Sequence, residues 1–143
     1  ELLRSAAKVT SLDVVLLERN GSTVDPSKLF GVEPQHGWCY YYQKAELARQ
    51  FGDWEQVVML AETAFSLDDH PNDPSERLPF IEGYAHTARW EDAVAQTQET
   101  LAITPVMQPV LCKLWQKIAA EIETSPEQQQ ALDEIDQTLQ CQF

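Results

Sequence analysis

The spacing of apolar side chains predicts that the chain is helical from residue 38 to its end. Between residues 54 and 65, apolar positions recur at steps of three and one, which is typical of a helix that buries one face. Similar spacing predicts five further helices: one over 38–51, one from near Leu78 to about 88, one over 90–103, one that carries Leu111 to Ile122, and one that carries Ala131 to Leu139.

Residues that favour helix starts and helix ends lie between these apolar segments. Gly52 stands where glycine commonly ends a helix. Asp53 and Gln56 then have the spacing of a capping box. Asp73 and Ser125 are each followed by a proline, which favours a new helix at both places. The loops between these helices are short, so we expect neighbouring helices to run antiparallel.

The first 37 residues have a different character. Leu2 to Leu12 have near-helical spacing, Val14 to Leu17 fit a helix or a strand, and turn-forming residues follow. We expect residues 1–37 to form an N-terminal helix and loop that belong to a preceding segment, and residues 38–143 to form the helical domain. The chain begins at Glu1 without a methionine, which indicates a piece of a longer protein.

An internal repeat with an offset of 36 residues runs through the helical region. Residues 52–55 (Gly-Asp-Trp-Glu) align with residues 88–91 (Ala-Arg-Trp-Glu), and Glu46 aligns with Glu82. Apolar positions also coincide along the following helices. They pair Val57 with Ala93, Val58 with Val94, Phe65 with Leu101, and Leu67 with Ile103.

These features resemble the tetratricopeptide repeat family, in which an aromatic residue opens the second helix of each hairpin and a proline closes the unit, as Pro105 does here. The resemblance implies an all-α, right-handed superhelix of antiparallel hairpins at about 38–69, 73–105 and 106–140. The chain departs from the family at Pro71, which comes two positions late, and the third hairpin lacks the Trp-Glu pair. A generic helical hairpin array is the alternative.

The resemblance also implies a function. In the family, the first helix of each hairpin lines a concave binding face, and those positions fall here on Tyr42, Glu46, Arg49, Gln50, Glu82 and His86. An acidic face of this kind would attract a basic or neutral extended peptide. We therefore expect a non-catalytic module whose partner is a protein or a peptide. The alternative is that these side chains are solvated helix faces joined by i,i+4 pairs.

A second resemblance covers less of the chain. Residues 37–50 and 79–85 look like the C-terminal tail of large uncharacterised bacterial membrane proteins that resemble glycosyltransferases. It implies a structural or regulatory soluble domain, membrane-associated and extracytoplasmic, whose partner is the membrane portion of its own parent chain. The parent could be an enzyme, whereas the resemblance brings no catalytic residue to this domain.

Composition and charge narrow these possibilities. The 143 residues include 23 acidic and 10 basic side chains, for a net charge of −13, which argues against nucleic acid as a partner. No apolar run is long enough to span a membrane. The three cysteines, Cys39, Cys112 and Cys141, cannot all pair within one chain. A reducing compartment is the simplest interpretation, but an exported one stays open, and the compartment is not assigned.

Chemistry-bearing side chains form no motif with a known catalytic spacing. His36 and Cys39 have a zinc-like spacing without a second pair of ligands, and the acidic loop at 68–76 lacks the EF-hand pattern. Glu82 and His86 could exchange protons only within a pocket that shifts their pKa values. The sequence therefore predicts no catalytic residue, no metal site and no cofactor, and it assigns Trp54 and Trp90 to packing between helices.

Overall fold

The part of the chain that the structure describes is entirely helical. A computed structural model describes residues 31–32 and 34–141, which hold six α-helices, two 3₁₀ helices and no strand. The all-α prediction is confirmed there, whereas the helix predicted near the N-terminus lies outside the described residues. The elements are α3 (Trp38–Gln50), α4 (Trp54–Phe65), η2 (Pro74–Arg77), α5 (Leu78–His86), α6 (Trp90–Ile103), η3 (Pro105–Met107), α7 (Gln108–Glu121) and α8 (Pro126–Leu139).

The predicted capping residues act where the sequence places them. The Asp53 carboxylate accepts a hydrogen bond from the backbone N–H of Gln56 at 3.1 Å. The Ser125 hydroxyl accepts one from the backbone N–H of Gln128 at 3.1 Å. Asp73 caps the 3₁₀ turn η2, and α5 follows from Leu78, as expected. These bonds satisfy backbone donors that have no partner inside a helix.

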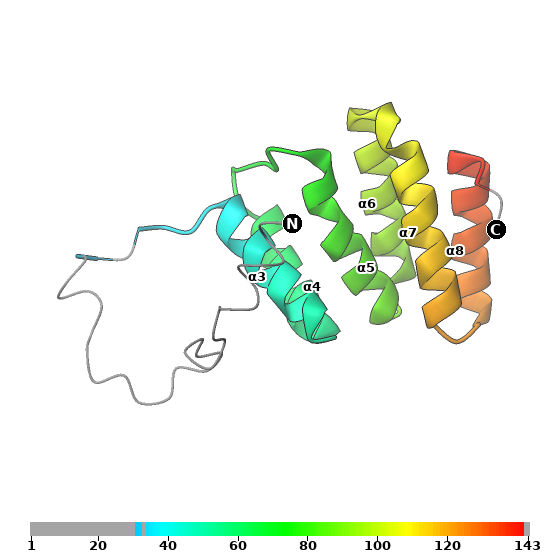
Figure 1. The fold of residues 1–143 in the computed structure, drawn as a ribbon, viewed down its shortest axis with the longest axis horizontal. Helices are drawn as coiled ribbons and strands as arrows, with labels where there is room; N and C mark the ends of the chain where they lie inside the picture. The colour runs from blue at the N-terminus through cyan, green and yellow to red at the C-terminus, as the bar shows by residue number, and fades with distance from the viewer. Residues whose placement is uncertain (1–30, 33, 142–143) are drawn as a thin grey trace, which may run out of the picture. The chain divides into compact units, whose positions relative to one another are not determined.

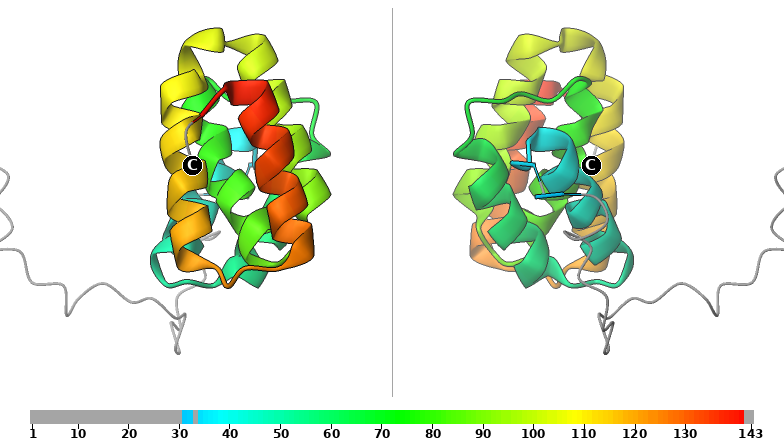
Figure 2. Two further views of the ribbon diagram at one scale, coloured as in Figure 1. Left: turned by 90° about the vertical axis from the view of Figure 1, so that its right-hand side faces the viewer. Right: turned by 90° about the vertical axis from the view of Figure 1, so that its left-hand side faces the viewer.

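The helices pair in chain order and stack in two layers. α3 packs against α4, α5 against α6, and α7 against α8. α5 contacts both α3 and α7, and α6 contacts α8, so the hairpins follow one another along the helical unit (Figures 1 and 2). We call α3, α5 and α7 the first-helix layer, and α4, α6 and α8 the second-helix layer.

The core lies between these layers. Trp38 and Trp115 are its most deeply buried tryptophans, with 1% and 0% of their surface exposed. Trp90 is buried at the opening of α6, as predicted, whereas Trp54 is half-buried. A Cβ atom at Gly83 would lie 3.1 Å from the Val57 Cβ, so the glycine lets α5 approach α4 closely.

The acidic loop between α4 and α5 is held by hydrogen bonds. Asp69 accepts one from the backbone N–H of Trp38 at 2.6 Å, which caps the start of α3. Glu76 accepts one from the Trp38 indole at 2.8 Å and one from the backbone N–H of Asn72 at 3.2 Å. These carboxylates therefore anchor α3 to the α4–α5 connection.

Candidate functional site

The structure brings four of the six predicted site residues together, with two partners from α7. Glu46 and Arg49 come from α3, and Glu82 and His86 come from α5. Tyr42 is half-buried on α3, and Gln50 is exposed at its end. We call the assembled group the ion cluster; its members are Glu46, Arg49, Glu82, His86, Lys117 and Glu121.

Glu82 is the centre of the ion cluster. Its side chain is fully buried, yet each of its two carboxylate oxygens bonds a cation. Arg49 Nη1 from α3 lies 2.9 Å from Oε2, and Lys117 Nζ from α7 lies 2.5 Å from Oε1. A buried carboxylate is costly unless it is paired in this way. The pairs therefore tie α3, α5 and α7 together through one side chain.

Arg49 extends the ion cluster to the edge of α3. Its Nη2 lies 2.9 Å from the Glu46 carboxylate, one turn away on the same helix. Its Nε is buried and makes no hydrogen bond. The charge-assisted bonds to Glu82 and Glu46 raise the pKa of Arg49 against the opposing effect of its burial. Arg49 is therefore a permanent cation between two carboxylates.

His86 lies at the far end of α5 in a partly apolar setting. Its ring stacks on the Trp54 indole from α4, with ring centroids 3.9 Å apart and planes 2° from parallel. Its buried Nε2 makes no hydrogen bond and lies 3.6 Å from Glu121 Oε2. Burial lowers the pKa of His86, although the neighbouring carboxylates of Glu82 and Glu121 oppose that shift. The ring is therefore neutral at neutral pH.

The charge of the first-helix layer differs from the acidic face that the sequence suggested. Its helices carry three acidic and four basic side chains: Glu46, Glu82 and Glu121 against Lys44, Arg49, Lys113 and Lys117. The second-helix layer carries nine acidic side chains and no basic one. These are Glu55 and Glu62 on α4, Glu91, Asp92 and Glu99 on α6, and Glu127, Asp133, Glu134 and Asp136 on α8.

The reason is that cations on neighbouring helices neutralise the aligned glutamates. Glu82 neither lines an open groove nor lies on a solvated helix face, because Arg49 and Lys117 enclose it. Sequence reasoning missed Lys117 and Glu121, which belong to the divergent third hairpin. Their i,i+4 spacing on one helix was the available signal. The position of Glu82 within the apolar run Leu78–Ala85 was the other signal, since an isolated charge there requires a partner.

The remaining sequence candidates do not join the ion cluster. The His36 ring stacks on Tyr40 at 3.5 Å between centroids. Cys39 is exposed, and its Sγ accepts a hydrogen bond from Asn72 at 3.4 Å. Among the residues that the structure describes, the carboxylates and the imidazole of Glu82, His86 and Glu121 lie close enough to share one cation.

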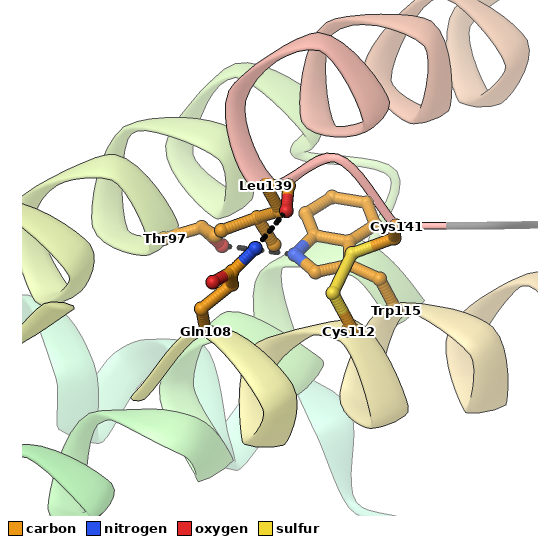
Figure 3. Close-up of a disulfide and its surroundings, with 6 residues drawn as sticks. All are labelled: Thr97, Gln108, Cys112, Trp115, Leu139 and Cys141. Atoms are coloured by element: carbon orange, nitrogen blue, oxygen red, sulfur yellow. Dashed lines mark hydrogen bonds between the residues drawn. A yellow bond between two sulfur atoms is a disulfide. The ribbon is translucent and has the colours of Figure 1, made fainter. Parts of the chain in front are cut away.

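A disulfide joins the ends of the third hairpin. Cys112 on α7 bonds Cys141, which follows α8, and their Cα atoms lie 5.6 Å apart (Figure 3). Beside it, the Gln108 side chain donates a hydrogen bond to the Leu139 carbonyl at 2.5 Å. The start of α7 is thus fixed to the end of α8. The sequence left this pairing open, since an odd number of cysteines allows several choices.

Two exposed apolar side chains lie near the predicted binding positions of α3. Leu47 is 47% exposed within the helix, and Phe51 directly after it is 64% exposed. They are one helical turn apart, so they share a face. Gln50 is adjacent to Phe51, and Glu46 is adjacent to Leu47, which places polar groups beside this apolar pair.

Comparison of the chain with known protein families, curated proteins and solved structures finds no match. Within the described residues, no helix is both long and apolar enough to cross a bilayer. The assignment of a function therefore depends on the geometry of the site.

Proposed function

We propose that this chain is a tetratricopeptide-like array and a non-catalytic module that binds an extended protein segment or peptide on its first-helix layer. The observation that supports the proposal is a surface stripe of half-buried and exposed side chains on α3 and at its end. There Tyr42, Glu46 and Gln50 recur at four-residue steps, and Leu47 and Phe51 lie beside them. An apolar anchor next to polar groups is a common composition for a peptide-binding surface.

The charges indicate which peptide fits. The ion cluster carries three carboxylates and two permanent cations, so its charges almost cancel within the layer. A neutral, amphipathic segment would therefore fit better than a strongly basic one. It would place an apolar side chain against Leu47 and Phe51 and hydrogen-bond to Tyr42 and Gln50. The ion cluster holds the three helices in register, which lowers the ordering cost of binding.

A peptide selection tests this function. Peptides selected on the immobilised chain from a random display library would be titrated by calorimetry against the parent, Leu47→Ala and Met59→Ala. Met59 is the matched control, since it is 56% exposed on α4 in the second-helix layer. We expect Leu47→Ala to weaken binding about tenfold, as for an interface residue worth more than ~1 kcal/mol. Equal losses for both variants, or a loss for Met59→Ala alone, would contradict the proposed surface.

The disulfide favours a second candidate function. Disulfides persist mainly in oxidising compartments, outside the cytosol. A structural or regulatory extracytoplasmic domain of a glycosyltransferase-like membrane protein would have the Cys112–Cys141 bond. Alkylation of unpaired thiols in native membranes, followed by mass spectrometry, tests this candidate. Unlabelled Cys112 and Cys141 support it, and full labelling of both would exclude the extracytoplasmic side.

A further inference from the structure

We infer that Glu82, His86 and Glu121 form a binding site for a first-row divalent cation such as zinc. When no metal ion is bound, the Lys117 ammonium pairs with the two carboxylates instead. One ligand atom from each of the three residues lies within 4.8 Å of the other two. Glu82 and His86 are one turn apart on α5, and Glu121 reaches the same point from the end of α7. The site thus joins two hairpins.

The donor set suits zinc. One imidazole nitrogen and two carboxylate oxygens are ligands that zinc accepts, and three protein ligands leave a fourth position for water. Two carboxylates and a neutral imidazole also balance the charge of a divalent cation. At bond lengths of about 2.0–2.2 Å, tetrahedral ligand atoms lie about 3.3–3.6 Å apart, so ligand atoms at the 4.8 Å limit must approach each other by about 1.2–1.5 Å. Glu121 is 44% exposed and can make that movement, whereas Glu82 and His86 are held by packing.

An independent observation at His86 points to a cation. Its Nε2 is buried and has no hydrogen-bond partner, and the nearest carboxylate oxygen is 3.6 Å away on Glu121. Buried polar atoms without a partner are rare in folded proteins. The stacked Trp54 ring fixes the imidazole plane and keeps the nitrogen in this position. A metal ion placed between the imidazole and the carboxylates would satisfy the nitrogen.

Lys117 occupies the place that a metal ion would take. Its Nζ bonds Glu82 Oε1 and lies 3.8 Å from Glu121 Oε2, which is the oxygen that faces His86. The side chain is 46% exposed, and its flexible stem allows the ammonium to turn into solvent. Arg49 binds the other oxygen of Glu82, so that ion pair survives the exchange. Metal binding is then a substitution of one cation for another, and the lysine weakens it.

Calorimetric titration with zinc chloride tests the site in the full chain. All variants carry Cys39→Ser, because the exposed thiol is a competing zinc ligand. We expect the parent to bind one equivalent. Lys117→Gln removes the competing ammonium and should bind zinc at least about tenfold more tightly, while Lys113→Gln, one turn earlier on α7, should leave affinity unchanged. His86→Asn removes a metal ligand. Loss of a residue that only hydrogen-bonds a ligand weakens metal binding ~10–100-fold, so loss of the ligand itself should weaken zinc binding by more than that.

Each outcome supports or contradicts the site. Equal affinity of Lys117→Gln and Lys113→Gln would overturn it, as would unchanged binding in His86→Asn, which would place zinc elsewhere on the chain. Glu121→Gln is a second ligand variant with an exposed side chain, for use if the circular dichroism of His86→Asn differs from that of the parent. Cobalt gives a separate result, because its visible absorption reports four-coordinate binding; an octahedral spectrum would contradict the arrangement. Peptide binding at Leu47 is a separate measurement, so the two proposals fail independently.

Discussion

The carboxylate of Glu82 lies between a cation from the preceding hairpin and a cation from the following one. Arg49 and Lys117 are 33 and 35 residues away along the chain, and the charged end of each side chain donates a hydrogen bond to this carboxylate. Neither cation is fully buried, since their side chains are 32% and 46% exposed. The arrangement therefore keeps one charge dry and two charges partly hydrated, which lessens the desolvation cost of the network.

The first prediction is that Glu82→Gln destabilises the fold strongly. Breaking a buried ion pair on one side costs about 3–5 kcal/mol, and the exposure of Arg49 and Lys117 favours the lower end of that range. Glu46→Gln is the control, because Glu46 bonds the same arginine from a half-exposed position and should cost no more than ~1 kcal/mol. Urea unfolding measures both free energies. Equal losses for the two variants would show that burial of Glu82 is unimportant.

A second prediction concerns the pH dependence contributed by His86. Burial lowers the pKa of this imidazole in the folded state below its ordinary value of 6.5. The unfolded chain therefore binds more protons than the folded chain once the pH falls below about 6.5, and stability falls with it. Above that pH both states are neutral at this residue, so the full contribution is present.

The measurement compares the free energy of unfolding at about pH 7.5 and about pH 5.5 for the parent and for His86→Gln. The variant lacks only the imidazole, so its own change in stability between the two pH values is the contribution of every other group. We expect the parent to lose more stability on acidification than the variant. A larger loss in the variant would mean that the negative charges of Glu82 and Glu121 outweigh burial and raise the pKa of His86 instead.

At the scale of the elements, the two best-matched hairpins turn in the same way. The chain leaves α3 through Gly52 at a φ of 69°, and it leaves α5 through Ala88 at a φ of 57°. These residues are the aligned pair of the 36-residue repeat, so the repeat preserves a left-handed turn even where the glycine is lost. A residue with a Cβ atom in the left-handed backbone conformation is destabilised by roughly 1–2 kcal/mol, and this cost applies to Ala88 but not to Gly52.

The third prediction follows from this difference. Ala88→Gly should stabilise the protein by about 0.5–1 kcal/mol, because relief of the left-handed strain exceeds the added freedom of the unfolded chain. The reverse change, Gly52→Ala, should destabilise it by a similar amount. Beyond the neighbouring residues nothing lies within 4 Å of the added Cβ, so only the left-handed strain and the reduced freedom of the unfolded chain act. Chemical denaturation curves measure both changes. A loss of stability in Ala88→Gly would show that the alanine methyl makes a packing contribution larger than the strain.

The same elements show which features of the fold could be predicted from the sequence. The bounds of α6, Trp90–Ile103, agree with the prediction, because a buried tryptophan opens the helix and Thr104 with its following proline closes it. The start of α5 at Leu78 also agrees with the prediction from the apolar spacing. Those signals are local. The apolar run around Glu82 signals that this carboxylate needs a partner. Its bond to Lys117 depends on how the hairpins stack, and no local pattern shows which cation reaches it.

At the scale of the whole helical unit, charge separates between the two layers. The first-helix layer nearly balances its acids and bases through the ion cluster, whereas the second-helix layer has only acids. Arg89 partly offsets this at the start of α6, where its guanidinium bonds Glu62 and Asp92. Helix α8 carries four acidic side chains and no lysine or arginine, so their mutual repulsion is not offset on that helix. Other contacts must therefore keep α8 packed against α6 and α7.

The disulfide supplies one of those contacts, and the last prediction is that it dominates the stability of the third hairpin. Cys112 and Cys141 are 29 residues apart, and closure of a loop of that size in the unfolded chain is worth roughly 3–4 kcal/mol in the loop-entropy description. Reduction should therefore lower the free energy of unfolding by about that amount and reduce hydrogen-exchange protection first in α8. The double variant Cys112→Ser, Cys141→Ser should have the free energy of unfolding of the reduced parent, with or without reductant. Cys39→Ser should respond to the reductant as the parent does. A parent that is insensitive to reduction would mean that buried Ile135 and Leu139, with the Gln108 bond, already hold α8 on the array without the disulfide.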